Sequence, residues 1–323
     1  MIPPAEAMMS DGNLAVFTGN AHPQLARDIC VKLAVPLGDA QVTEFSNENI
    51  WVKINENVRG KDVFVVQPFS TPVSTSILEL LIMIDALKRA SARRISAVIP
   101  YYAYGRTDKK DQPRVPITAR LLADCVSAAG AHRVLTMDLH AGQIQGFFNI
   151  PVDELTAQNI LVRHVREQTI PDLTVVATDA GFAKKARNFA ERLGAPLAIV
   201  AKRRLGNDGH MESMGLIGDV AGRNALIVDE EIDSAGSMLQ AARVVREQGA
   251  RELYACAVHG VLSGPAIERL GGSDLREVIL TDTIPLPAAK RLPIISQLSV
   301  ADTFARAIIR IHEDRSVSEI FEG

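Results

Sequence analysis

Short apolar runs rich in β-branched residues recur along the chain, and turn residues bound each of them. Nearly continuous apolar runs of this length are typical of strands that are covered on both faces of a parallel sheet. We therefore predict strands at residues 62–67, 94–100, 133–139, 174–178, 197–202, 225–230, 253–260 and 277–282.

Between these runs lie segments whose apolar residues recur with the period of a helix. They predict helices at residues 23–33, 77–90, 117–129, 183–193, 238–248 and 300–312. Because strands and helices alternate, we expect an α/β architecture with parallel sheets. At roughly 150 residues per domain, a chain of 323 residues predicts two domains. We place the division at residue 155, in a quiet stretch where Pro151 restricts the chain.

The composition excludes several classes of protein. A hydrophobic share of 47% excludes a disordered chain. The 35 Lys and Arg residues against 38 Asp and Glu leave no basic excess for binding a nucleic-acid backbone. The longest apolar stretch, residues 77–87, is interrupted by Glu79 and Asp85 and is too short to span a membrane. The N-terminus lacks a secretory signal, so we expect a soluble cytoplasmic protein.

The chain has three cysteines, which are far apart and have apolar neighbours. An odd number at such spacing predicts reduced core thiols and argues against a disulfide framework or a zinc site. These residues are Cys30, Cys125 and Cys256.

Residues 225–245 form the most informative segment: a strand, an acidic pair, a loop of small residues and a helix. Small residues bring backbone N–H groups close to an anion at a helix N-terminus, which favours a phosphate monoester. Carboxylates beside such a loop suit vicinal hydroxyls or hydrated Mg²⁺, and a sugar phosphate offers both kinds of group. The alternative is an ordinary turn with Asp233 or Ser234 as the N-cap of the helix. Neither a P-loop nor a G-x-G-x-x-G motif occurs.

Two further strand ends carry possible metal ligands. Asp138 and His140 are two residues apart, so on a strand they would face the same side and could share a metal or its bound water. Asp179 follows another strand and precedes a helix. The alternative for His140 is a structural histidine.

Cations are concentrated in two places. Lys202, Arg203 and Arg204 follow an apolar strand, where they could neutralise charge on a transferred phosphoryl group. The alternative is a solvated basic turn. The polar loop at residues 105–114 could close over an anionic ligand, although a plain surface loop is the alternative.

Together these segments resemble the ribose-phosphate pyrophosphokinase family, whose members make phosphoribosyl diphosphate (PRPP). The likeness covers nearly the whole chain. The matching runs are FSNEN, VRGKDVFVVQP, ELLIMIDALKRASA, DLHAGQIQGFFNIPVD, AKRR, HGVLSGPAIERL and QLSVADTFARAI.

The resemblance implies two phosphoribosyltransferase-type domains, each with a central, mainly parallel sheet flanked by helices. Residues 1–155 would form the ATP side and residues 156–323 the ribose 5-phosphate side, with the last helix packing back on the first domain. The implied reaction transfers the diphosphoryl group of ATP to the anomeric hydroxyl of ribose 5-phosphate, giving PRPP and AMP. The implied cofactor is Mg²⁺. The resemblance also implies a homohexamer that inorganic phosphate activates.

The resemblance also assigns roles to single residues. Asp229 and Glu230 would hold the ribose hydroxyls, and Lys202 and Arg204 would stabilise the diphosphoryl group in flight. The 5-phosphate would lie on Asp233, Ser234, Ala235, Gly236 and Ser237. Mg²⁺ bound to the triphosphate would lie near His140 and Asp179. ATP would contact Phe45, Asn47, Asn49, Arg106, Thr107 and Asp108. Regulatory phosphate would bind Arg59, Ser316 and Ser318.

The chain departs from the family pattern at five of these or neighbouring positions. Glu230 replaces the usual Asp, which lengthens the reach of a ribose-binding carboxylate. Asn49 replaces Glu and Thr107 replaces Gln at positions that the resemblance assigns to nucleotide binding. Pro113 and Asn57 each replace a Ser.

Three other functions fit parts of the pattern. One is a phosphoribosyltransferase that consumes PRPP, and another is a non-catalytic subunit associated with an active synthetase. The third is a DNA-binding regulator that senses PRPP, although the sequence shows no basic recognition helix.

Overall fold

The computed structural model describes residues 12–205 and 211–320, with the side chains of 202–205 and 211–214 left out. The described chain forms two compact units. One unit takes in the residues up to Thr156, the short segment Thr283–Pro285 and the residues from Ser299 onward. The other comprises Ala157–Asp282 and Leu286–Leu298. The first passage between the units therefore lies next to the predicted division at residue 155.

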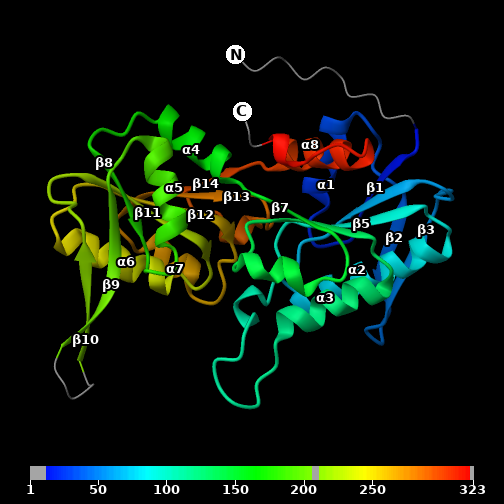
Figure 1. Ribbon diagram of the computed structural model, residues 1–323, viewed down its shortest axis with the longest axis horizontal. Helices are drawn as coiled ribbons and strands as arrows, with labels where there is room; N and C mark the ends of the chain where they lie inside the picture. The colour runs from blue at the N-terminus through cyan, green and yellow to red at the C-terminus, as the bar shows by residue number, and fades with distance from the viewer. Residues whose placement is uncertain (1–11, 206–210, 321–323) are drawn as a thin grey trace. The chain divides into compact units, whose positions relative to one another are not determined.

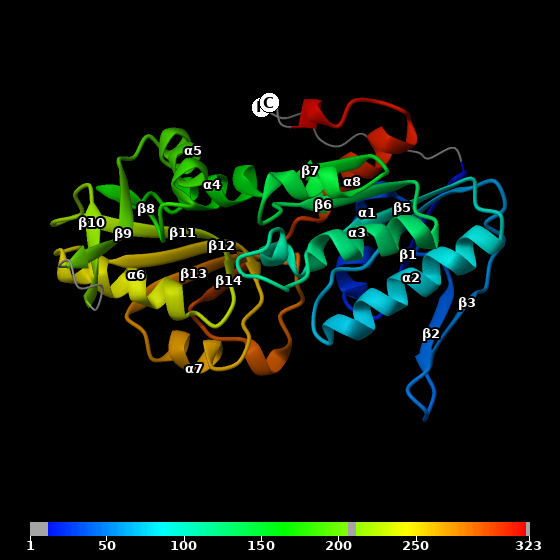
Figure 2. The ribbon, with the colours of Figure 1, turned by 60° about the horizontal axis from the view of Figure 1, so that its bottom comes forward.

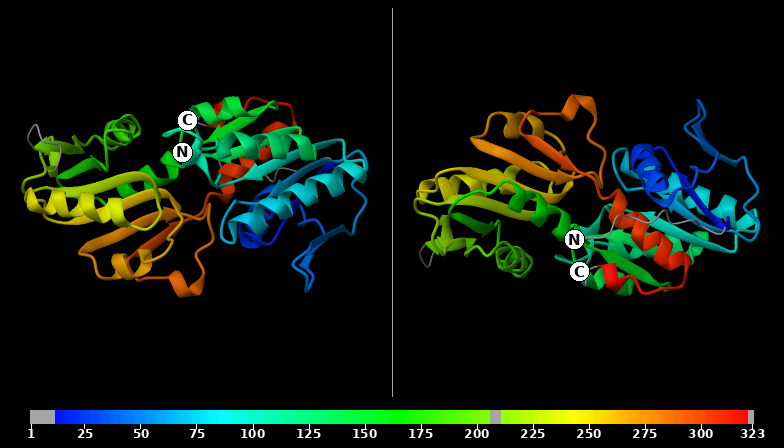
Figure 3. Two further views of the ribbon diagram at one scale, coloured as in Figure 1. Left: turned by 90° about the horizontal axis from the view of Figure 1, so that it is seen from below. Right: turned by 90° about the horizontal axis from the view of Figure 1, so that it is seen from above.

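The first unit is built on a five-stranded parallel sheet, in the order β1-β4-β5-β6-β7 (Figure 1). Its helices cover both faces: α2 and α3 lie on one, and α1 and α8 lie against each other on the other (Figure 3). The strands are Leu14–Thr18, Asp62–Val66, Arg94–Ile99, Arg133–Met137 and Val152–Leu155. The helices are α1 (Pro23–Leu33), α2 (Val73–Arg89), α3 (Thr118–Ala129) and α8 (Ala301–His312).

Alternation along β4 explains why this sheet needs helices on both sides. All five residues of the strand are buried. Val63 and Val65 belong to one core cluster with Leu80 and Met83 of α2, whereas the side chain of Phe64 lies on the opposite face. A separate antiparallel hairpin of β2 (Ala40–Glu44) and β3 (Ile50–Ile54) extends from this unit (Figure 2).

The start of the sheet is tied to the end of α8 by a buried ion pair. The Arg94 side chain donates to the carboxylate of Asp62, which is 5% exposed. Arg94 also donates to Asp314 at 2.8 Å and to the carbonyl of Ile311 at 2.8 Å, at the end of α8. His312 Nδ1 lies 2.9 Å from Asp62 Oδ2. The last helix is thus held on the first unit through charged groups.

The second unit contains a seven-stranded sheet in the order β10-β9-β8-β11-β12-β13-β14, parallel except where β10 pairs with β9. Helices α4 and α5 contact each other on one face, and α6 and α7 contact each other on the other (Figure 2). The strands are β8 (Leu173–Ala177), β9 (Leu197–Leu205), β10 (Met211–Ile217), β11 (Asn224–Ile232), β12 (Leu253–Gly260), β13 (Leu275–Thr281) and β14 (Ile295–Leu298). The helices are α4 (Gln158–Glu167), α5 (Ala183–Leu193), α6 (Gly236–Glu247) and α7 (Ala266–Gly271).

The order of strands reverses between β8 and β11. From β8 the chain crosses through α5 to β9 on one side, and from β11 it crosses through α6 to β12 on the other. In open α/β sheets, ligands bind beyond the carboxyl ends of the strands at such a reversal. We therefore expect a ligand-binding site at this edge of the second unit.

The predicted α/β architecture with parallel sheets is confirmed. The sequence missed the short elements: β1, the hairpin, β7, α4, α7, β10 and β14. All three cysteines, which lie in the described part of the chain, are free; Cys30 and Cys256 are buried, but Cys125 is only half-buried. None of the helices in the described part of the chain combines the length and apolar character of a membrane span.

Candidate active site

Asp229 links the two strands at the reversal. Its Oδ2 accepts a hydrogen bond of 2.7 Å from Thr178 Oγ1, which directly follows β8, and its Oδ1 accepts one of 2.7 Å from the Glu230 N–H. Burial raises the pKa of the Asp229 carboxyl above its ordinary value, and the nearby carboxylates of Asp179 and Glu230 add to this effect. The Thr178 hydrogen bond opposes the shift in pKa. Holding a negative charge on Asp229 at the sheet edge is therefore costly.

Glu230 is the more buried member of the acidic pair, with 6% of its surface exposed. Its Oε2 lies 3.1 Å from Nζ of Lys185, which projects from the first turn of α5. The Lys185 ammonium also lies 5.9 Å from the centre of the Phe182 ring. Strand β11 and helix α5 thus meet through an ion pair at the candidate site. Both carboxylates lie within β11, which runs on to Ile232, two residues beyond the predicted end.

The loop from Asp233 to Ser237 leads directly into α6, which starts at Gly236. The N-cap is Ala235, whose φ of 60° is left-handed, and no side chain caps the helix. The alternative that Asp233 or Ser234 is the N-cap is therefore wrong. The first backbone N–H groups of the helix have no partner within it, which suits them to an anion.

Two residues outside the predicted set shape this loop. Ser263 donates its hydroxyl to Asp233 Oδ1, and its N–H donates to the Asp233 carbonyl at 3.0 Å. Arg269 of α7 donates to the carbonyl of Ser234 at 2.9 Å. A Cβ on Gly236 would lie 3.5 Å from the Arg269 guanidinium. The loop therefore lies beside a cation that the sequence analysis did not single out.

Asp179 is exposed and lies just after β8. Its Oδ1 accepts a hydrogen bond of 2.9 Å from the N–H of Phe182, at the start of α5. A Cβ on Gly181 would come within 3.1 Å of the same oxygen, so glycine leaves room for the carboxylate. Asp179 thus belongs to the same edge as Asp229.

Lys202 and Arg204 lie in the part of β9 that extends past the end of β8. The β8 pairing with β9 stops at Ile199, whereas β9 continues beside β10, with Lys202 opposite Met214. The backbone thus carries these two positions beyond the carboxyl edge of the sheet. Their side chains, and that of Arg203, lie outside the described part of the structure.

In the first unit, two predicted loops pack against each other beyond β5 and β6. Gly105 lies so close to His140 that a Cβ on the glycine would be 2.9 Å from His140 Cβ. Gln143 donates to Asp108 Oδ2 at 2.7 Å, which joins the 3₁₀ turns Gly105–Thr107 and Gly142–Phe147. The loop that carries Arg106 and the loop that carries His140 therefore form one surface.

Asp138 and His140 do not face the same side of a strand, so this prediction is wrong. Strand β6 ends at Met137, and Asp138 has a left-handed φ of 41°. Asp138 accepts a hydrogen bond of 3.0 Å from Thr156, whereas His140 is exposed in the following loop. The turn breaks the period of two on which the argument depended, so the two side chains do not form a strand-based metal pair.

Thr107 has a structural role in its loop. Its hydroxyl donates to the Tyr104 carbonyl at 2.7 Å and accepts from the Ala119 N–H at 3.2 Å, in the first turn of α3. Thr107 thus supplies the cap that α3 otherwise lacks. Arg106, on the same 3₁₀ turn, is exposed.

The three residues expected around adenine lie at the tip of the hairpin. Phe45 is 53% exposed, and its ring centre is 6.5 Å from that of Trp51. The tip is closed by backbone hydrogen bonds from the Phe45 N–H to the Asn49 carbonyl at 2.9 Å and from the Glu48 N–H to the Phe45 carbonyl at 2.8 Å. The Asn49 N–H also donates to Asn47 Oδ1 at 3.2 Å. An exposed aromatic side chain on a closed turn is available for stacking.

The three positions expected to bind regulatory phosphate all belong to the first unit and are exposed. The hydroxyls of Ser316 and Ser318 lie 2.7 Å apart. Arg310 donates to the Ser316 carbonyl at 2.9 Å. Arg59 follows Asn57, whose side chain accepts its N–H at 3.0 Å.

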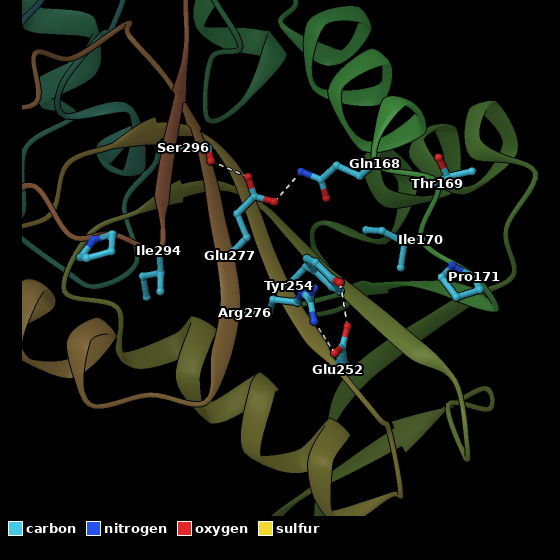
Figure 4. A pocket seen from close by; sticks show the side chains of 11 residues that line it. Gln168, Thr169, Ile170, Pro171, Glu252, Tyr254, Arg276, Glu277, Ile294 and Ser296 are labelled. Carbon is cyan, nitrogen blue, oxygen red and sulfur yellow. Dashed lines mark hydrogen bonds and ion pairs between the residues drawn. The ribbon is translucent and has the colours of Figure 1, made fainter.

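A pocket of about 520 Å³ opens at the edge of the second sheet that is opposite to the one carrying Asp229 and Glu230. It lies at the starts of β12, β13 and β14 (Figure 4). Glu252 accepts hydrogen bonds there from Tyr254 and Arg276, while Glu277 accepts from Gln168 and Ser296. Burial alone would raise the pKa of Glu277, but its hydrogen bonds with Ser296, Gln168 and His164 lower that pKa below its ordinary value. None of the predicted site residues lines this pocket.

Comparison with known proteins identifies the family. Residues 14–130 match the N-terminal domain of ribose phosphate pyrophosphokinase, and residues 207–322 match the phosphoribosyl synthetase-associated domain. The ribose-phosphate pyrophosphokinase of Caldanaerobacter subterraneus subsp. tengcongensis is 54% identical over 96% of this chain and 98% of its own length. The Bacillus subtilis protein of the same name is 46% identical over 96% and 98%.

A solved structure agrees with these sequences. The crystal structure of phosphoribosylpyrophosphate synthetase from Mycobacterium smegmatis matches with a TM-score of 0.89 and 42% identity. The match covers 94% of this chain and 99% of that one. The resemblance drawn from the sequence is therefore confirmed, and so is the phosphoribosyltransferase-type fold. By sequence and by structure, over nearly its whole length, this chain belongs to the ribose-phosphate pyrophosphokinase family of enzymes.

Proposed function

We propose that the protein transfers the diphosphoryl group of ATP to the anomeric hydroxyl of ribose 5-phosphate, producing PRPP and AMP. The observation that carries the proposal is the edge of the second sheet at its reversal. There an acidic pair in β11 directly precedes a loop of small residues at the start of α6. A pentose phosphate presents hydroxyls and a phosphate at matching positions.

The ribose 5-phosphate would bind through two kinds of contact. Asp229 and Glu230 accept hydrogen bonds from the ribose hydroxyls, as carboxylates do. The N–H groups at the start of α6 and the hydroxyls of Ser234 and Ser237 donate to the 5-phosphate. The Ser263 hydroxyl donates a hydrogen bond to the Asp233 carboxylate, which holds the start of the loop in place. This fixed loop supports the assignment.

ATP would bind mainly to the first unit. Phe45 would stack on adenine, with Asn47 and Asn49 beside it. Arg106 would donate to the triphosphate, while Thr107 and Asp108 hold the shape of its loop through the hydrogen bonds described above. The replacements at Asn49 and Thr107 therefore differ in their expected effect on nucleotide preference. The Thr107 side chain already makes hydrogen bonds within the protein, so Asn49 is the position to test for nucleotide preference.

The residues that would hold the Mg²⁺ carried by ATP are His140 of the first unit and Asp179 of the second. Asp179 is exposed and uses only one oxygen for Phe182, and Mg²⁺ commonly binds one or two carboxylates together with phosphates and water. Among the side chains that the structure describes, none form a cluster of three or more metal ligands. When bound, Mg²⁺ would neutralise charge on the phosphates.

The protein's own contribution would be positioning and charge neutralisation. The anomeric oxygen attacks the β-phosphorus in line as the bond from that phosphorus to the oxygen of AMP breaks. Because both substrates are anionic, bringing them together and neutralising their repulsion supplies most of the acceleration. Lys202 and Arg204 are the cations that we assign to the transferred diphosphoryl group.

The test is product analysis after mixing the purified protein, Mg²⁺, ATP and ribose 5-phosphate. The proposal predicts AMP and PRPP in equal amounts, and no AMP when ribose 5-phosphate is left out. A phosphoribosyltransferase would instead consume PRPP and an acceptor base without using ATP. A non-catalytic subunit would form no product alone. Either of these results would refute the proposal.

Phosphate activation is a second proposal, which rests on exposed Arg59, Ser316 and Ser318. Their hydroxyl and guanidinium groups are suitable donors for an inorganic phosphate. We propose that this phosphate binds where subunits of a homohexamer meet. A rate that does not change with phosphate concentration would refute activation, and sedimentation equilibrium would test the hexamer. The expected cytoplasmic location stays a prediction.

A further inference from the structure

The ion pair between Glu230 and Lys185 is a feature that the sequence did not foresee. Lys185 Nζ lies 3.1 Å from Glu230 Oε2, and the Glu230 side chain is only 7% exposed, against 42% for that of Lys185. The cation therefore comes from the solvent side to a carboxylate that is almost enclosed. Such a pair differs from a surface ion pair, because one partner cannot turn away into water.

Glutamate at this position needs to be held for a geometric reason. Its side chain has one more methylene than aspartate, and so one more rotatable bond between backbone and carboxylate. Its neighbour Asp229 is fixed by Thr178 and by a backbone N–H. Glu230 is instead held by a side chain on another element, α5.

Helix α5 is well placed to supply a steady cation. Its start is fixed by the hydrogen bond from the Phe182 N–H to Asp179, and Lys185 follows within the first turn. The ammonium lies 5.9 Å from the Phe182 ring centre, which further restricts it. The position of Lys185 is thus coupled to the same sheet edge that carries the acidic pair.

We propose that Lys185 is a positioning residue for ribose 5-phosphate, which fixes the Glu230 carboxylate in one orientation toward the ribose hydroxyls. The inference rests on the proposed role of Glu230 in binding ribose. Lys185 acts through Glu230 and not on the transferred group. Its importance follows from the length of the glutamate, so a shorter aspartate at position 230 removes the need for it.

The test compares steady-state kinetics of single and double variants. Lys185→Met keeps the length of the side chain and removes its charge, and we expect the KM for ribose 5-phosphate to rise about 5- to 10-fold. The turnover number and the KM for ATP should stay within about twofold, because the transferred group is not touched. Lys185→Arg should restore a KM near that of the wild type.

Two further variants isolate the cause. Arg187→Met removes the same charge from the same helix at an exposed position and should leave the kinetics unchanged. In a Glu230→Asp background, Lys185→Met should change the KM for ribose 5-phosphate by less than about twofold. If Lys185→Met folds poorly, Lys185→Gln, which also removes the charge but keeps a polar side chain, takes its place in both backgrounds with the same expected results.

The outcomes separate this inference from the proposed function. A wild-type protein that forms no AMP with ribose 5-phosphate refutes the function. An active protein in which Glu230→Gln leaves the KM for ribose 5-phosphate unchanged refutes the ribose role of Glu230. If Glu230→Gln raises this KM but Lys185→Met does not, or if Lys185→Met has the same effect in the Glu230→Asp background, Lys185 does not position Glu230.

Discussion

The contact between Gly105 and His140 makes a precise prediction about the first unit. Gly105→Ala would place a Cβ 2.9 Å from His140 Cβ, where ordinary carbon contacts need about 3.5–4.0 Å. The obstructing atom is the Cβ of His140, which moves only with its backbone. The two loops beyond β5 and β6 must therefore separate, by roughly half an ångström to one ångström.

The size of the effect follows from this displacement. Forcing extra carbon into a packed contact costs about 1–3 kcal/mol, and each kcal/mol lowers the melting temperature of a domain of this size by about 2–4 °C. A misplacement of about 1 Å at a reacting site can reduce the rate about 100-fold. We expect kcat/KM for MgATP to fall about 10- to 100-fold, with a melting temperature lower by roughly 2–12 °C.

Gly146→Ala is the matched control. Gly146 lies in the neighbouring 3₁₀ turn, Gly142–Phe147, and a Cβ there would meet nothing within 4 Å. Neither glycine has the positive φ that disfavours alanine, so the two substitutions differ only in available space. The assay is AMP formation at varied MgATP and fixed, saturating ribose 5-phosphate, with a thermal melt of each variant.

The same kcat/KM for MgATP in Gly105→Ala and Gly146→Ala would refute this prediction. The prediction also fails in part if Gly105→Ala lowers the melting temperature but leaves kcat/KM intact, since the loops then separate without disturbing ATP. In that case His140 and Arg106 do not contact ATP as we propose.

Three further substitutions test other parts of the structure. Because burial raises the pKa of Asp229, the negative charge of Asp229 opposes folding at neutral pH. Asp229→Asn should therefore raise the melting temperature of the substrate-free protein by a few degrees at pH 8, and this gain should shrink as the pH falls toward 4. The same substitution should raise the KM for ribose 5-phosphate. An unchanged melting temperature at pH 8 would contradict this. Arg269→Met should loosen the phosphate loop and raise the same KM about 3- to 10-fold with the KM for ATP unchanged; equal changes in both would argue against it. Arg94→Met should lower the free energy of unfolding, measured by chemical denaturation, by about 2–4 kcal/mol, because it removes an ion-pair partner from buried Asp62. Asp314→Asn, at an exposed carboxylate, should leave the free energy of unfolding almost unchanged. Equal losses of unfolding free energy in the two variants would show that burial does not govern these ion pairs.

The sequence predicted the interior of the fold better than its margins. Strand β12 at residues 253–260 and helices α1 and α5 have the predicted bounds. These segments bury their apolar residues against the main sheets, so burial and periodicity coincide. The hairpin at Ala40–Glu44 and Ile50–Ile54 was missed because its strands are half-exposed, with little apolar contrast.

Local backbone conformation accounts for the errors near the site. Asp138 and Ala235 both adopt left-handed φ values, which are uncommon for residues other than glycine. At Asp138 the turn ended a strand two residues before its predicted end, and at Ala235 it moved the helix cap. Both conformations depend on neighbouring segments: Asp138 accepts from Thr156, and the loop around Ala235 is held by Ser263 and Arg269.

The ion pair between Lys185 and Glu230 is the clearest feature of the site that could not be predicted from the sequence. Forty-five residues separate Lys185 from Glu230, and the intervening chain contains the whole of β9 and β10. The two side chains meet because the order of strands reverses between β8 and β11, so that the helix following one strand lies beside the end of the other. Motifs can identify the acidic pair, since its residues are adjacent in sequence. The cation that balances the pair depends on strand order, which no local pattern encodes, and its discovery requires the fold.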